Sequence, residues 1–129
     1  MVTVLLDTRV LVWAAHRSER LGTGRQVMAD ADRRVVSAVC VWELAVKQRL
    51  GKLSLGSDVG TWIRRMTGEL ALDHLPVTAE HAAGVEQLPD VHRDPFDRLL
   101  VAQAVAEGAV LLTADARLTG YGDVVRLVG

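Results

Sequence analysis

Four carboxylates in four separate segments are the residues of this 129-residue chain best suited to chemistry: Asp7, Glu43, Asp97 and Asp115. Two like charges about 5 Å apart repel by roughly 3 kcal/mol at an effective dielectric constant of about 20, so a cluster of acids favours a divalent cation. Mg²⁺, with Mn²⁺ as a possible substitute, prefers oxygen ligands and commonly keeps waters and a substrate phosphate. If the four acids converge, we expect a metal-activated water and hydrolysis of a phosphodiester.

Each acid also has an ordinary structural explanation when it is taken alone. Asp7 and Asp115 are equally explained as turn or capping residues at strand ends, and Asp97 as a complement to a helix dipole. Glu43 is more informative, because it stands beside Trp42 in an apolar helical segment, where a carboxylate needs a partner or a metal. The prediction therefore depends on the convergence of the acids.

The elements expected along the chain alternate between strand and helix. Apolar runs predict strands at 2–6, 34–39, 71–77, 109–112 and 124–128, the last as an edge strand. Helical spacing and capping signals predict a first helix with Thr8 as its N-cap. They predict further helices at 25–31, 37–50, 57–69 (opened by Ser57), 78–88 and 95–107, with a short turn at 113–119. This pattern predicts one α/β domain over residues 1–129, a three-layer α/β/α sandwich around a mainly parallel sheet.

Functional groups in such sheets collect at the carboxyl edge of the strands. Asp7 and Asp115 follow two of the most apolar strands. The helix at 95–107 must end at the opposite edge to enter the next strand, so its beginning, with Asp94 as N-cap and Asp97, points to the carboxyl edge. Glu43 lies about one turn into the helix after the second strand, which allows it to reach the same place.

Composition limits the classes of function and compartment. Fifteen Lys and Arg against 16 Asp and Glu give a net charge of −1, so any nucleic-acid contact must use a local basic patch. The single cysteine, Cys40, excludes an internal disulfide and favours a buried thiol in a reducing compartment. No run approaches the ~20 apolar residues of a membrane span, and the apolar N-terminus is too short for a signal peptide, so we expect a cytoplasmic protein without a membrane partner.

Other polar and aromatic residues have two open interpretations. Two basic groups, Lys47, Arg49 and Lys52 on one side and Arg93 and Arg98 on the other, are either an RNA footprint or solvated helix faces. His92, in a polar loop, is expected to be a surface residue, with phosphate contact or proton transfer as the alternative. The three tryptophans, Trp13, Trp42 and Trp62, are expected in core or dimer packing.

Several segments together resemble the PIN-domain toxins of the VapC type along the whole chain. They are Leu5-Leu6-Asp7-Thr8, Val41-Trp42-Glu43-Leu44-Ala45-Val46-Lys47, Arg49-Leu50-Gly51-Lys52-Leu53, the long run HRDPFDRLLVAQA at 92–104, and Leu112-Thr113-Ala114-Asp115. The resemblance implies a Mg²⁺-dependent endoribonuclease, toxic in a toxin–antitoxin pair, that forms a homodimer, cuts RNA and is neutralised by a cognate antitoxin. It implies Asp7, Glu43, Asp97 and Asp115 as metal-binding and catalytic residues, with Thr8, Arg9, Asp94 and Thr113 as accessory or substrate-binding residues.

Arg9 departs from the pattern, since this branch of the family usually has His two positions after the first acid. A cation there either reaches a substrate phosphate, pairs with the acids and weakens metal binding, or is simply solvated. The leading alternative function is therefore a non-catalytic binding module of the same fold, with its acidic mouth blocked by Arg9. An aspartyl phosphatase is disfavoured, because it requires a second Asp where this chain has Arg9.

Overall fold

A five-stranded sheet in which every neighbouring pair is parallel forms the centre of the protein. The computed structural model describes all residues, 1–129. The strands are β1 (Thr3–Leu6), β2 (Arg33–Ser37), β3 (Leu72–Leu75), β4 (Val110–Thr113) and β5 (Val125–Leu127), in the order β3-β2-β1-β4-β5. The predicted parallel sheet is confirmed, with β5 at its edge. The order also makes β1 and β4 neighbours, which brings the segments after them together.

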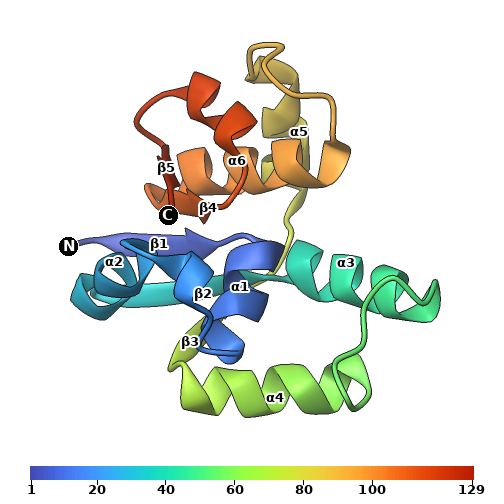
Figure 1. Cartoon of the computed structure of the whole chain (residues 1–129). Helices are drawn as coiled ribbons and strands as arrows, with labels where there is room; N and C mark the ends of the chain where they lie inside the picture. Colours follow the sequence, from blue (N-terminus) through green and yellow to red (C-terminus); the bar gives the residue numbers. More distant parts are fainter.

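Six α-helices connect the strands: α1 (Thr8–Ala15), α2 (Gly24–Asp30), α3 (Ala38–Arg49), α4 (Val59–Glu69), α5 (Ala79–Gly84) and α6 (Pro95–Glu107). Short 3₁₀ helices lie at Glu19–Leu21, Val85–Gln87 and Ala116–Tyr121. Figure 1 shows α5 and α6 on one side of the sheet and α1 and α4 on the other. Right-handed crossovers require this, since the chain steps from β1 outward to β3 and then returns past β1 to β4. The predicted three-layer sandwich is confirmed.

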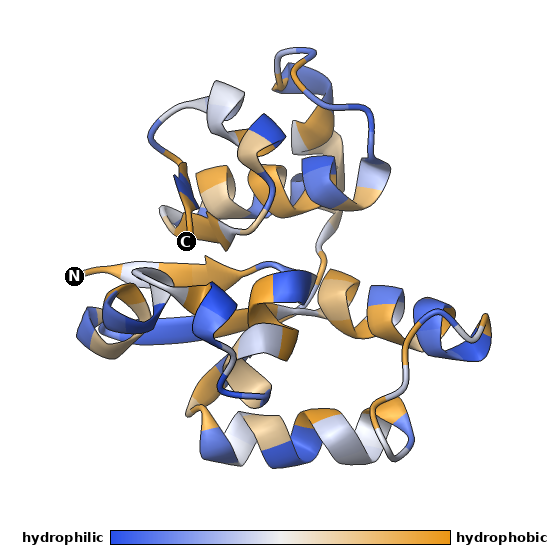
Figure 2. Cartoon of the chain, viewed as in Figure 1, coloured by the Kyte–Doolittle hydropathy of each residue, from blue (hydrophilic) through white to orange (hydrophobic).

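The core lies on both faces of the central strands. Val4, Leu5 and Leu6 of β1 are at most 1% exposed, as expected for a parallel strand covered by helices on both sides. Figure 2 shows β1 in the hydrophobic colour, whereas β2 is partly in the hydrophilic colour, and both colours occur along α4. Trp62 of α4 is buried as predicted, whereas Trp42 of α3 is 59% exposed and packs its ring 4.7 Å from that of Phe96. No helix has the length and apolar character to cross a membrane.

Two predicted helix starts were wrong by one residue, and both corrections involve an aspartate. The N-cap of α1 is Asp7 rather than Thr8, and that of α4 is Asp58 rather than Ser57. In each case the carboxylate accepts a bond from the backbone N–H three residues on, Val10 or Thr61, at 2.8 Å. Helix α1 thus begins immediately after β1, and its cap is one of the candidate site acids.

Strand β2 ends at Ser37 rather than at residue 39, because α3 begins at Ala38, and β5 covers only Val125–Leu127 of the predicted 124–128. Two other elements are much shorter than predicted. Strand β3 covers only Leu72–Leu75, because Ala71 has a positive φ of 52° and Pro76 has no N–H for the ladder. The helix expected at 78–88 ends at Gly84 and tightens into the 3₁₀ turn that follows. Helix α6 has the predicted bounds, between the cap Asp94 and the left-handed Gly108, because its capping residues specify both ends.

Candidate active site

A small acidic cavity of about 120 Å³ lies where the carboxyl ends of β1 and β4 meet the beginning of α6. Ten residues line it: Asp7, Thr8, Arg9, Glu43, Lys47, Asp94, Asp97, Ala114, Asp115 and Arg117. All four acids singled out in the sequence are among them, although they come from four different segments. The accessory candidates Thr8, Arg9 and Asp94 line it too, and Thr113 contacts it through Asp7.

Asp7 is the most deeply placed of the acids, with only 6% of its surface exposed. Its Oδ1 accepts from the Val10 N–H at 2.8 Å, and its Oδ2 accepts from the Thr113 hydroxyl at 2.5 Å and the Ala114 N–H at 3.2 Å. Burial raises the pKa of Asp7, although these donors and the charge of Arg9 act in the opposite direction. Neighbouring strands β1 and β4 therefore supply both the carboxylate and the donors that orient it.

Asp97 stands in the first turn of α6 and has little to balance its charge. Burial raises the pKa of Asp97 to about 6, and the nearby carboxylates of Asp94 and Asp7 raise it as well. Asp94 itself is occupied as the helix cap, accepting from the Phe96 N–H at 2.8 Å. The ionised form of Asp97 would therefore be stabilised by a nearby cation.

Glu43 and Asp115, in contrast, are each paired with a cation of the chain. The Glu43 carboxylate accepts from the Thr8 hydroxyl at 2.5 Å and lies 3.0 Å from Lys47 Nζ. Asp115 accepts from Arg117 Nε at 3.1 Å and Nη2 at 2.9 Å, and these bonds lower the pKa of Asp115 to about 2. Lys47 and Arg117 therefore belong to the site. The sequence alone assigns Lys47 either to an RNA footprint or to a solvated helix face, and it does not single out Arg117.

Arg9, the residue expected to decide between catalysis and blockage, pairs with none of these acids. It is exposed and lines the cavity, but no hydrogen bond or ion pair joins its guanidinium to a carboxylate. The acids that do have a cationic partner use Lys47 and Arg117. Arg9 therefore acts on Asp7 through its charge but forms no ion pair with an acid of the cavity.

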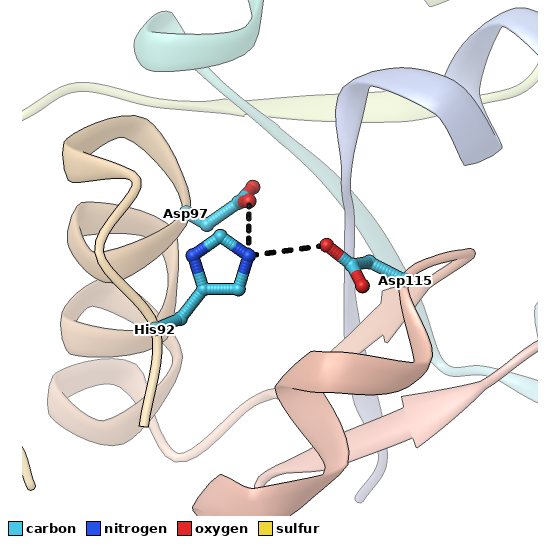
Figure 3. A group of neighbouring side chains, drawn as sticks. All are labelled: His92, Asp97 and Asp115. Atoms are coloured by element: carbon cyan, nitrogen blue, oxygen red, sulfur yellow. Dashed lines mark hydrogen bonds and ion pairs between the residues drawn. The ribbon is translucent and has the colours of Figure 1, made fainter. Parts of the chain in front are cut away.

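His92 was predicted as a surface residue, and this prediction is wrong, since its side chain is only 8% exposed. Its Nδ1 accepts the Asp94 N–H at 2.9 Å, which places the ring proton on Nε2. Nε2 lies 3.2 Å from Asp115 Oδ2 and 3.8 Å from Asp97 Oδ2 (Figure 3). One ligand atom from each of these three side chains lies within 4.8 Å of the others. The sequence signal was the position of His92 two residues before a helix cap, where a side chain folds back onto the helix start.

The donor set of the cavity fits a hard divalent cation. Its acidic side chains offer oxygen atoms, which Mg²⁺ and Mn²⁺ prefer. The one thiol, Cys40, is fully buried beside Leu6, and burial raises its pKa to about 12, so it stays protonated. His92 in the tautomer above presents a proton rather than a lone pair to the carboxylates. Asp7, Glu43, Asp97 and Asp115 supply carboxylate oxygens to the lining of the cavity, and of these four Asp97 and Asp115 have ligand atoms within 4.8 Å of each other.

Comparison with known proteins gives one family and one fold. The family described as PIN domain matches residues 4–123. Ribonuclease VapC22 of Mycobacterium tuberculosis is 32% identical over 123 residues, which covers 94% of this chain and 93% of that protein. VapBC2 from Rickettsia felis, solved bound to a promoter DNA fragment, superposes with a TM-score of 0.74 at 15% identity, covering 98% of this chain and 99% of the other. A toxin–antitoxin complex from Klebsiella pneumoniae superposes with a TM-score of 0.67 at 14% identity, covering 95% of each chain.

Proposed function

The chain belongs to the PIN domain family, and from this premise we propose that it is a Mg²⁺-dependent endoribonuclease, the toxic component of a toxin–antitoxin pair. The observation that carries the proposal is the gathering of four acids from distant segments into one cavity. The ribonuclease activity named for the relative at 32% identity supports the reaction. The blocked binding module is the weaker candidate, because Arg9 forms no ion pair in the cavity.

The chain's own residues have separable parts in this reaction. Asp7, held by three donors, would present an oriented carboxylate to the ion, and Asp97 lines the same cavity from the first turn of α6. With a pKa of about 6, Asp97 is mostly ionised at neutral pH and can accept a hydrogen bond from the attacking water. Arg117 is 75% exposed at the rim and can contact a phosphate oxygen. When bound, Mg²⁺ would lower the pKa of that water and stabilise charge on the phosphate.

We also propose two protein partners, a cognate antitoxin and a second copy of the chain. The solved relatives described as toxin–antitoxin assemblies support the first. An exposed apolar stripe on α3, formed by Trp42, Val46 and Leu50 at successive helical turns, supports an apolar protein contact. Light scattering coupled to size exclusion tests the homodimer, and growth arrest on expression without the antitoxin gene tests toxicity.

The decisive experiment is RNA cleavage by the purified protein with Mg²⁺, with Mn²⁺ and with EDTA. We expect cleavage only with a metal, and Asp7→Asn or Asp97→Asn should lower the rate by about 100-fold or more. Asp30→Asn, at the exposed end of α2, is the matched control and should cleave like the wild type. Absence of cleavage at every metal concentration, with Asp7→Asn indistinguishable from the wild type, would instead favour the binding module.

A further inference from the structure

A second, larger cavity of about 690 Å³ adjoins the acidic one. Its six lining residues are Asp90, Val91, His92, Arg93, Arg98 and Arg117. Arg117 lines both cavities, and His92 contacts the acids of the smaller one through Nε2. The two cavities therefore share a wall, and a chain-like ligand that has one unit at the carboxylates can continue across Arg117 into the larger space.

The larger cavity has an excess of positive charge in a chain whose net charge is −1. Three arginines face one carboxylate, and Val91 is the one apolar side chain in the lining. A protein segment that binds by burying apolar side chains has little to contact there, whereas a phosphate backbone finds charged donors. The lining also has no Phe, Tyr or Trp on which bases could stack.

The three arginines are not equivalent. Arg98 is committed to the fold, because its Nη1 donates to Pro89 O at 3.0 Å, His92 O at 3.3 Å and the Tyr121 hydroxyl at 3.1 Å. Its Nη2 donates to Val85 O at 3.2 Å, so the guanidinium holds the 88–93 loop in place. Arg93 is exposed and forms no ion pair, and Arg117 uses only Nε and Nη2 on Asp115. Donor capacity for a ligand therefore remains on Arg93 and on Arg117 Nη1.

We propose that this cavity is a phosphate-binding subsite for the RNA strand on one side of the cleaved bond, with Arg93 and Arg117 as its ligands. The inference rests on the proposed nuclease function and specifies the surface that binds the RNA strand. Recognition there is of the sugar–phosphate backbone, because the contacts available are charged donors without a stacking platform. The subsite therefore contributes affinity that is the same for every base sequence.

The test is binding of a short fluorescein-labelled single-stranded RNA, followed by anisotropy in EDTA at a series of KCl concentrations. EDTA removes the metal and stops cleavage, so only binding is measured. Arg93→Gln and Arg117→Gln should each weaken binding by about five- to tenfold, and each should reduce the slope of log K against log salt by about 0.7. The loss should be equal for oligo(U) and oligo(A). Arg20→Gln is the matched control, an exposed arginine beyond the end of α1 that lines neither cavity.

Arg117→Lys separates a phosphate contact from the support of Asp115. Lysine keeps a positive charge for the phosphate but cannot reproduce the two hydrogen bonds to Asp115. Arg117→Lys should therefore bind RNA with most of the affinity that Arg117→Gln loses. Affinity and salt slope of Arg93→Gln equal to those of Arg20→Gln would overturn the subsite. A second result would also overturn it: Arg93→Gln and Arg117→Gln bind RNA like the wild type but no longer bind an oligoglutamate peptide. That result would assign the cavity to an acidic protein segment.

Wild-type cleavage with Mg²⁺, measured in parallel, distinguishes failure of the subsite from failure of the proposed function. If the wild type cleaves RNA and neither variant has a binding defect, the subsite is refuted and the proposed nuclease function stands. If Arg93→Gln has a binding defect but the wild type does not cleave RNA, the RNA-binding surface is supported and the proposed nuclease function is refuted.

Discussion

Replacing Asp97 by Asn should stabilise the metal-free protein although it removes a site acid. In the folded state the pKa of Asp97 is raised from 3.8 to about 6, chiefly by burial. At 1.36 kcal/mol per pH unit this corresponds to at most about 3 kcal/mol of unfavourable free energy when the group is ionised. Its side chain is 21% exposed, and an acid in the first turn of a helix contributes about 0.3–1 kcal/mol through the dipole. We therefore expect a net gain of about 1–2 kcal/mol.

The pH dependence gives this prediction its sign. Because the folded pKa is raised, the folded state holds the proton more tightly, and the penalty is absent below the unfolded pKa of 3.8. It grows as the pH rises between the two values and is complete above about 6. The advantage of Asp97→Asn should therefore be full at about pH 7.5 and nearly gone at about pH 4.

Urea unfolding in EDTA at these two pH values measures the effect, with Asp30→Asn as the control. A second series with Mg²⁺ tests the cause. An ion at 100 times its dissociation constant stabilises the folded state by about 2.7 kcal/mol, so the wild type should overtake the variant. An Asp97→Asn protein less stable than the wild type in EDTA at about pH 7.5, or an advantage that does not change with pH, would refute the electrostatic reasoning.

Two further predictions concern residues that orient the acids, each with Mg²⁺ affinity measured by calorimetry. His92→Ala should weaken Mg²⁺ binding by about tenfold, because the N–H that holds Asp115 is lost, and His92→Gln, which keeps a donor, should recover part of it. Equal affinities for wild type and His92→Ala would contradict this role. Thr113→Val should also weaken binding by about tenfold, since Asp7 loses the hydroxyl that lowers its pKa, and Thr113→Ser should restore it. Failure of serine to rescue would point to packing around β4 instead.

The convergence of the acids could be predicted because local signals specify it. The cap Asp94, Pro95 and the αL Gly108 determine where α6 begins and ends, and chain connectivity then directs Asp97 to the carboxyl edge. That β1 pairs with β4 had no local signal, because strand order is decided by how the helices pack over both faces. The bonds from Thr113 and Ala114 to Asp7 follow from that pairing and were beyond the sequence for the same reason.

The residues that pair with the acids differ in how well they could be predicted from the sequence. Lys47 stands four residues after Glu43, and helix geometry places such a pair side by side. Arg117 follows Asp115 by two residues in a turn, where no periodic rule fixes the side-chain direction. His92 reaches the site because its Nδ1 accepts the N–H of the capping residue Asp94, a local contact that the polar composition of the loop does not predict.

The four acids of the cavity divide into two that form an ion pair with Lys or Arg and two that do not. Asp7 and Asp97 form no ion pair with Lys or Arg, and burial raises the pKa of both, so an added cation would stabilise their ionised forms. Glu43 and Asp115 already hold Lys47 and Arg117, whose side chains are 46% and 75% exposed. A divalent ion would therefore be drawn to Asp7 and Asp97, while Lys47 and Arg117 present positive charge to the solvent. An anionic RNA strand that approaches the cavity would meet these positive charges first, and a bound metal would neutralise the carboxylates that otherwise repel it.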